Sequence, residues 1–244
     1  MTTAPPDAAL ADLAVPPPPG RTVTGPDGHP LPWAGDRAVP IGPWERPHRA
    51  HPETGLWPLL LSPLHEDDDD GFRPWLTGEL RPDGDGRAHD AQALLARWRH
   101  PDGAGGTDHA PAPGHADTGA ADARDLAAET EAVRPVRLGL VAAPDGAAAL
   151  AACGWTGAAN RRTTGEVAAV LAHWQHRLGV RLVEAGFDTL RLSVPHPPAS
   201  TREALPPAGQ VAALCPDLLH QGDGTLTALA RQPAGARSWT LWWD

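Results

Sequence analysis

Apolar residues recur at helical spacing within residues 163–179, which is the clearest periodic signal in the chain. The residues concerned are Val167, Val170, Leu171, Trp174 and Leu178. They fall on one face of a helix with 3.6 residues per turn. Thr163 or Thr164 can cap the first turn, and Glu166 complements the helix dipole there. Gly179 predicts the end of the helix.

Segments of strand composition lie on both sides of this helix. Residues 180–184 and 189–194 follow it and are separated by the short turn 185–188. The second of them alternates apolar and polar side chains, which is typical of a strand with one buried face and one wet face. Residues 136–142, upstream, have the same composition. We therefore predict three strands from these segments.

The chain ends in a tryptophan-rich segment of strand composition. Side chains alternate along a strand, so Trp239, Leu241 and Trp243 share one face. Trp242 points to the other face, beside Thr240. We expect this strand to be covered by core packing on both sides, and the alternative is that one face is presented to a partner.

Further helices are expected around these strands. Their signals are a capping residue before an apolar stretch and a glycine or proline after it. The expected segments are residues 90–99, 145–152, 208–214 and 225–231. Strands mixed with helices in this order predict an α+β fold, with a mixed or antiparallel sheet and flanking helices.

Composition divides the chain into four parts. Residues 1–53 are rich in proline and are expected to form a tail or a surface arm. Residues 54–100 are expected to be an ordered segment that packs on the main domain, with Pro58 marking a strand at an edge or bulge. Residues 101–132 are expected to be a disordered linker because they lack large apolar side chains. Residues 133–244 form the main domain.

The formal net charge of −10 disfavours a nucleic-acid partner. Residues 1–132 contain 22 acidic residues and 10 arginines, and residues 133–244 have a net charge of +2, so neither part has a basic footprint. No stretch approaches the roughly 20 apolar residues of a membrane helix. The first residues also lack the pattern of a signal peptide. We therefore expect a cytoplasmic protein with no membrane partner.

Two patterns could hold a metal ion, and each has a simpler interpretation. The acidic run at residues 66–70 lacks the alternating spacing of a calcium loop, so a solvated loop is expected. His173 and His176 are three apart on the expected helix, but no third ligand or HExxH pattern accompanies them. We predict no metal site and no cofactor.

Cys215 is a candidate nucleophile. It lies at the end of an expected helix, directly before Pro216, where the helix dipole disfavours a thiolate. Cys153 is distant in sequence, and the two cysteines form no disulfide framework or metal-binding pattern. A buried structural thiol is expected, with a reactive thiol as the alternative.

Several residues could line one concave pocket that orients a small ligand. They are Trp155, Asn160, Arg177, Asp188 and Asp217. The asparagine and the two aspartates lie in expected loops beside glycine, tryptophan or proline. Residues of these types in loops also serve as turn formers that bond the nearby backbone. The ligand pocket and the turn-forming role remain alternatives.

Short motifs combine in an order that resembles one bacterial protein family. They are Gly154-Trp155-Thr156-Gly157 with Asn160, Val170-Leu171 through Trp174 to Arg177 and Gly179, Gly186-Phe187-Asp188-Thr189-Leu190, Leu192-Ser193-Val194 with Pro197-Pro198, Cys215-Pro216-Asp217, and Trp239 with Trp242-Trp243-Asp244. On these residues the segment from about Arg134 onward resembles the domain of unknown function 4253. The resemblance implies a shared fold and a bacterial, cytosolic origin, and it implies no activity.

The chain departs from the family pattern where acids would be expected. Gln175 and His176 stand in place of an acidic pair, and Gln210 with Val211 stands in place of Glu-His. These replacements favour a binding or structural role over catalysis.

The leading hypothesis is therefore a cytosolic protein-interaction or small-ligand-binding domain without a catalytic role. The first alternative is a hydrolase-like enzyme that uses Cys215, Asp217, Asn160 and Arg177. The second alternative is a structural role, for example as a toxin-neutralising or regulatory partner.

Overall fold

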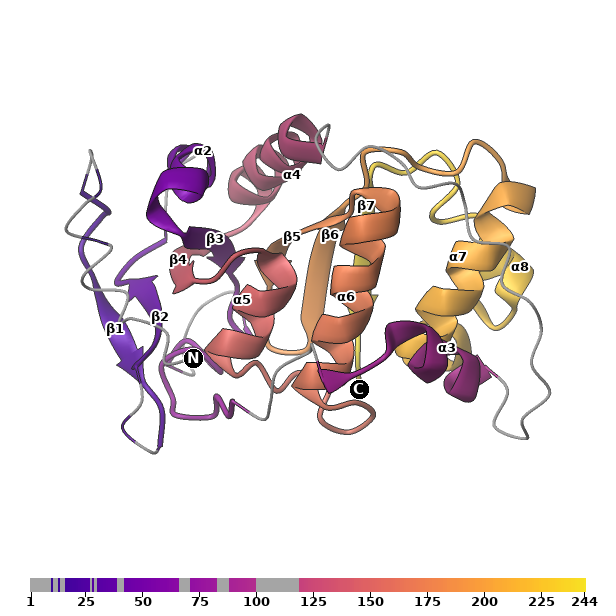
Figure 1. Cartoon of the computed structure of the whole chain (residues 1–244), viewed down its shortest axis with the longest axis horizontal. Coiled ribbons are helices and arrows are strands. Elements are labelled where there is room, and N and C mark those ends of the chain that lie inside the picture. Colours follow the sequence, from indigo (N-terminus) through magenta and orange to yellow (C-terminus); the bar gives the residue numbers. More distant parts are fainter. Residues whose placement is uncertain are drawn as a thin grey trace.

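The computed structural model describes residues 10, 13, 16–26, 28, 30–38, 42–65, 71–82, 88–99 and 119–244 (Figure 1). Within them a seven-stranded sheet has the strand order β1-β2-β4-β3-β5-β6-β7. The strands are β1 (Gly20–Thr24), β2 (Pro30–Gly35), β3 (Leu56–Leu61), β4 (Arg137–Ala142), β5 (Arg181–Ala185), β6 (Thr189–Ser193) and β7 (Ser238–Trp242). Neighbouring strands run antiparallel except β3 and β5, which are parallel. The predicted α+β class with a mixed sheet is confirmed.

Helices pack on both faces of this sheet. They are α2 (Glu45–Thr54), α3 (Ala91–Arg99), α4 (Gly119–Val133), α5 (Gly146–Cys153), α6 (Thr164–Leu178), α7 (Thr201–Leu214), the π-helical turn η2 (Leu218–Asp223) and α8 (Leu226–Leu229). Thr163, one of the two predicted caps of α6, forms a capping box with Glu166, and Gly179 ends the helix in the left-handed conformation. None of the described helices combines the length and the apolar character needed to span a membrane.

Successive residues of β3 show how the two faces are filled. Leu59 and Leu61 belong to the larger apolar core, which also contains residues of α5 and α6. Leu60 belongs to a smaller core that contains Leu126 and Ala127 of α4. Figure 1 shows α5 and α6 together on the near side of the sheet. The result is a helix–sheet–helix arrangement in which alternate side chains of the strand pack into the core on one face and the core on the other.

Strand β3 is central, although it belongs to the segment that was expected to pack on the main domain from outside. All six of its residues are buried. It pairs along its whole length with β4, and Leu60 and Leu61 pair with β5. The family-like segment from residue 133 therefore contributes β4 and β5 as strands that are separated by β3. The sheet is not contained within that segment.

Pro58 is tolerated in this central strand because its nitrogen needs no ladder partner. The bond from Ala143 N–H to Gly55 O directs the main-chain groups of Gly55 and of every second residue toward β4. Pro58 is therefore turned toward the β5 side, where pairing begins two residues later, at Leu60. Its carbonyl oxygen accepts the indole N–H of Trp44, 3.1 Å away.

The proline-rich N-terminal part contributes β1, β2 and α2 to the fold, where a tail or surface arm was expected. Trp33 and Trp44 are 4% and 0% exposed, respectively, and both join the smaller core. Pro30 is the first residue of β2, where a missing N–H is tolerated. The high proline content masked two aromatic anchors that bury enough area to order this part.

Helix α4 lies within the segment that was expected to be a disordered linker. It buries residues at positions i, i+3, i+4, i+7 and i+8, namely Ala123, Leu126, Ala127, Thr130 and Glu131. This stripe is helical in period but small in side-chain size, so a search for large apolar residues misses it. Residues 101–118 of the expected linker lie outside the described residues.

Helix α7 begins seven residues earlier than predicted. Ser200 caps it by accepting the Glu203 N–H. Pro206 and Pro207 lie inside the helix and remove two main-chain donors. The carbonyls that lose these donors belong to Arg202 and Glu203, which are exposed, so water can bond them.

The predicted alternation along β7 is confirmed. Trp239, Leu241 and Trp243 are buried, whereas Thr240 is exposed and Trp242 is half-buried. Among the described strands, β7 pairs with β6 alone and forms one edge of the sheet. The face of β7 that carries Trp239, Leu241 and Trp243 is covered as expected, whereas the face with Thr240 and Trp242 is covered only in part.

Candidate functional site

Four of the short motifs meet at one end of the sheet. They are the loop after α5, the turn between β5 and β6, the segment after α7, and the end of β7. We call their contacting residues the motif cluster, and it consists of Trp155, Gly157, Asp188, Cys215, Asp217 and Trp243. Specific contacts, which are described below, join the end of β7 to each of the other three motifs.

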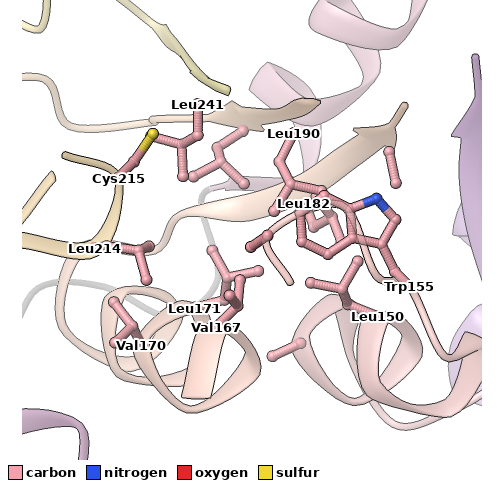
Figure 2. Packing of buried hydrophobic residues seen from close by; sticks show 14 of the residues in the cluster. Leu150, Trp155, Val167, Val170, Leu171, Leu182, Leu190, Leu214, Cys215 and Leu241 are labelled. Atoms are coloured by element: carbon pink, nitrogen blue, oxygen red, sulfur yellow. The ribbon is translucent and has the colours of Figure 1, made fainter. Parts of the chain in front are cut away.

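Trp155 anchors the motif cluster from inside the core. It is fully buried, and its Nε1 donates a hydrogen bond of 2.8 Å to the carbonyl oxygen of Gly186. Its ring meets the ring of Trp243 edge-on at 5.4 Å. Figure 2 shows Trp155 among Leu150, Leu182 and Leu190. Because it is enclosed, Trp155 positions the turn and the end of β7 and offers no surface to a ligand.

Gly157 allows the loop after α5 to cross directly over the β5–β6 turn. A Cβ atom at this position would overlap with the carbonyl oxygen of Phe187 and with the indole of Trp155. Gly157 is therefore required by close approach of the backbone.

Asp217 is a fully buried carboxylate that is bound on several sides. Arg161 Nη2 lies 2.8 Å from its Oδ1, and the Asp244 N–H donates to Oδ2 at 3.3 Å. Burial opposes its ionisation, but the hydrogen bonds from Arg161 and Asp244 outweigh burial and lower the pKa of Asp217. It is held as an anion that fastens the end of β7 to the segment after α7.

Cys215 is a buried thiol whose Sγ donates to the carbonyl oxygen of Trp242 at 2.7 Å. Burial raises the pKa of this thiol to about 12. Figure 2 shows its sulfur beside Leu241, within the same apolar core as Leu214. The thiol is protonated at neutral pH, which agrees with the expected structural role.

Asp188 lies in the β5–β6 turn and is half-buried. Its carbonyl oxygen accepts the Trp243 N–H at 3.0 Å, which extends the pairing of β6 and β7. Partial burial and the carboxylate of Asp244 raise the pKa of the Asp188 side chain. Asp188 thus combines a main-chain role in closing the sheet with a carboxyl group that interacts with the carboxylate of Asp244.

The structure brings together three of the five residues predicted to line a pocket. Trp155, Asp188 and Asp217 all contact Trp243 or Asp244. Asn160 is exposed on the loop after α5, next to Arg161 in sequence. Arg177 lies in the last turn of α6, about 21 Å along the helix axis from the capping residue Thr163. The arginine that contacts the motif cluster, through Asp217, is therefore Arg161, which the sequence reasoning missed.

A signal for Arg161 was present but ambiguous. It lies in the pair Arg161-Arg162 directly before the cap of α6, so the folded chain carries it to the same end of the sheet as Asp188. Arg177 was preferred because it belongs to a motif of the family. Arg162 takes a different role, since its guanidinium stacks 4.0 Å from the ring of Trp98 and donates to the Ala213 carbonyl.

A second polar cluster that sequence reasoning did not predict lies under α4. Glu184 is buried, accepts the Ser62 hydroxyl at 2.8 Å, and lies 3.3 Å from Arg134 and 3.8 Å from Arg191. Burial raises the pKa of Glu184 even though both arginines oppose this effect. Arg191 also donates to Thr130 of α4 at 2.7 Å. This network clamps α4 to the β5–β6 hairpin.

A β-bulge explains why Glu184 points toward α4. The register shifts between Leu182 and Glu184, and Glu184 then faces Arg191 across the hairpin. Leu182 belongs to the larger core, whereas Val183 belongs to the smaller core under α4. The extra residue places Val183 and Glu184 on the same face, which simple alternation cannot predict.

A cavity of about 140 Å³ lies between β7, α7, η2 and α8. Its lining residues are Ala208, Val211, Leu218, Leu229, Gln232, Pro233, Ser238, Trp239, Thr240 and Leu241. None of the five predicted pocket residues lines it. The sequence signal for this cavity was the tryptophan-rich strand, which had been assigned to the core.

Within the described ranges, no three His, Cys, Asp or Glu side chains gather in a way that could hold a metal ion. The acidic run at residues 66–70 lies outside the described residues. His173 is half-buried and His176 is exposed on α6.

We expect Asp217→Asn to lower the melting temperature by several degrees at pH 7. The pKa of Asp217 is lowered on folding from its ordinary value of 3.8, so the carboxylate stabilises the fold above that pH. This stabilisation is lost as the pH falls through the folded-state pKa. The melting temperatures of the parent protein and of Asp217→Asn should therefore converge as the pH is lowered from 7 to 2.5. Asp125→Asn, on the exposed side of α4, is the matched control. A difference that persists unchanged into acid contradicts this account.

Comparison with known proteins and family models gives a match for part of the chain. Neither the curated proteins nor the solved structures gave a match. Residues 137–244, which contain every residue of the motif cluster, match the model of a family described as Domain of unknown function (DUF4253).

Proposed function

We propose that this chain is a binding protein, for a protein partner or a small molecule, without a catalytic role. The observation that carries this proposal is the state of Cys215. Its pKa is raised to about 12, and its proton is donated to the Trp242 carbonyl oxygen. A nucleophilic thiol needs the opposite environment, with a nearby base or a positive charge that stabilises the thiolate.

The other groups of the hydrolase alternative support the same conclusion. Asp217 is bonded to Arg161 and to the Asp244 N–H, so it is not oriented toward a base or a nucleophile. Arg177 lies at the far end of α6. Gln210, which replaces a family acid, accepts the Trp174 indole N–H at 2.7 Å and is buried. These contacts give Asp217 and Gln210 a structural use.

We propose further that the protein functions in the bacterial cytosol. The chain has no lysine and is rich in Arg, Ala, Gly, Pro and Asp, which GC-rich codons encode. Both cysteines are free and buried, which supports a reducing compartment.

Thiol titration with a chromogenic disulfide reagent tests the absence of nucleophilic chemistry. With a pKa of about 12 for both Cys153 and Cys215, the thiolate fraction at pH 7 is on the order of 10⁻⁵. We expect no reaction in the native protein and two equivalents after denaturation. The Cys153→Ala and Cys215→Ala variants assign each equivalent. Rapid reaction of native Cys215 with a midpoint near neutral pH contradicts the proposal.

The binding part of the proposal has its own test. A tagged protein is used to recover partners from native lysate, and its thermal stability is measured against a panel of metabolites. A stoichiometric partner or a saturable rise in melting temperature is expected. If no partner is recovered and no metabolite raises the melting temperature, the proposed function is wrong.

A further inference from the structure

The outer edge of β7 opens onto the cavity. The bonds Trp243 N–H to Asp188 O and Val194 N–H to Arg237 O direct the main-chain groups of the odd-numbered residues 237–243 toward β6. The main-chain groups of Ser238, Thr240 and Trp242 therefore point away from β6. Cys215 bonds the Trp242 carbonyl on this side. Ser238 and Thr240, which Cys215 does not reach, line the cavity.

The wall opposite this edge is apolar. Val211 of α7, Leu218 of η2 and Leu229 of α8 supply it, and none of the lining residues carries a charge. A charged ligand would lose hydration here without gaining an opposite charge. The lining also includes the polar residues Gln232, Ser238 and Thr240, so the cavity suits an uncharged molecule that combines an apolar part with a polar group.

Size restricts the ligand further. The cavity measures about 140 Å³, which is less than the roughly 300 Å³ of a small drug-binding pocket. A dry apolar cavity of about 150 Å³ is large enough for one benzene ring. The space beside β7 therefore fits a molecule with a single ring and a small substituent.

Trp239 supplies the polar complement. This residue lines the cavity and is 6% exposed, and its ring meets Trp174 edge-on at 5.7 Å. Its Nε1 is buried and finds no hydrogen-bond acceptor within the described part of the chain. Trp155 and Trp174, which are also buried, both donate through Nε1. A buried donor without an acceptor is costly, and a ligand that brings an acceptor relieves that cost.

We propose that the cavity between β7, α7 and α8 is a binding site for a small, uncharged, single-ring molecule with one hydrogen-bond acceptor, which bonds Trp239 Nε1–H. This inference rests on the proposed function and names its ligand class. The apolar wall receives the ring, and the indole of Trp239 selects for the acceptor. Main-chain groups of Ser238 and Thr240 stand at the cavity as further polar contacts.

Two near-isosteric probes test the proposal on the full chain. Benzonitrile carries an acceptor, and toluene presents a similar ring without one. Binding is followed through the indole N–H resonances in ¹H–¹⁵N correlation spectra, where Trp239→Phe identifies the Trp239 signal by its loss. We expect saturable movement of that signal by benzonitrile and about tenfold weaker binding of toluene. In Trp239→Phe, where binding is followed through the indole N–H signal of the neighbouring Trp174, the two probes should bind with similar affinity.

Filling the cavity supplies the second arm. Ala208→Leu places three more carbon atoms at the wall and should abolish binding of both probes. Ala152→Leu makes the same change at an exposed position of α5 and should leave binding unchanged. Circular dichroism shows whether Ala208→Leu folds. If it does not, the comparison of the two probes in Trp239→Phe still tests whether Trp239 selects the acceptor.

The possible results separate this inference from the proposed function. If neither probe moves the Trp239 signal, or if toluene binds as well as benzonitrile to the parent protein, the ligand class is wrong. The proposed function is still supported after such a result if a partner is recovered from lysate and native Cys215 is unreactive. A reactive native Cys215 overturns the proposed function even where benzonitrile binds at Trp239.

Discussion

A chain that begins at Gly119 is expected to show no cooperative unfolding transition, although it contains the entire segment that matches the family. It lacks β3, whose six residues pair with β4 and whose last two pair with β5. Five of these residues are Leu or Trp side chains that are no more than 2% exposed. Burial of each contributes roughly 1.5–3 kcal/mol, so their loss is comparable to the 5–15 kcal/mol that stabilises a typical domain.

The measurement is urea denaturation followed by circular dichroism and tryptophan fluorescence. A chain that begins at Gly42 is the control, since it keeps α2 and β3 and, of the described strands, lacks β1 and β2. That control should unfold cooperatively at a lower midpoint than the full chain. A steep, coincident transition in the chain from Gly119 would mean that β4 and β5 can pair without β3.

Ending the chain at Ser238 is expected to abolish the native fold as well. The deletion removes the buried side chains Trp239, Leu241 and Trp243, each of which would cost about 2–5 kcal/mol to truncate to alanine. It also removes the carbonyl that accepts the Cys215 thiol and the Asp244 N–H bound by Asp217. The buried carboxylate of Asp217 then depends on Arg161 for its main compensation.

Near-ultraviolet circular dichroism is a suitable measurement, because the edge-on pairs Trp155–Trp243 and Trp174–Trp239 are both lost. The matched control is Thr240→Ala, an exposed change in the same strand, which should alter stability by less than about 0.5 kcal/mol. Retention of a sharp thermal transition in the shortened chain would show that β6 can serve as the edge of the sheet.

The sequence predicted those elements that are marked by several local features at once, such as apolar spacing, capping residues and a terminal glycine. Helix α6 has an apolar stripe, a capping box and a terminal glycine, and all three agree. The hairpin of β5 and β6 and the alternation along β7 follow from composition and period. The bulge before Glu184 could not be predicted, because it depends on where the two strands of the hairpin settle in register.

Non-local arrangement accounts for most of what sequence reasoning missed. The alanine-based stripe of α4 is too small to stand out until a sheet lies beneath it. The proline-rich N-terminal part is ordered by Trp33 and Trp44, whose burial depends on strands that come about a hundred residues later in the chain. Tertiary packing therefore overrode a composition that is typical of a tail.

The candidate site divides in the same way. The structure brings Trp155, Asp188 and Asp217 together because these residues hold the end of β7. Arg177 was predicted to join them but lies in the last turn of α6. Arg161 precedes the first turn of α6 and Arg177 lies in its last turn, and this difference becomes informative once the helix has been placed on the sheet.

The location of β3 has a consequence for how the chain assembles during synthesis. The hydrogen bond between Ser62 and Glu184 closes a loop of 122 residues. Strand β3 can acquire β4 as soon as residue 142 has left the ribosome, but its other edge stays open until β5 follows. At about 5–20 residues per second, an apolar edge is exposed for several seconds. The nascent chain is therefore most prone to aggregation in this interval, and a chaperone that covers β3 would protect it then.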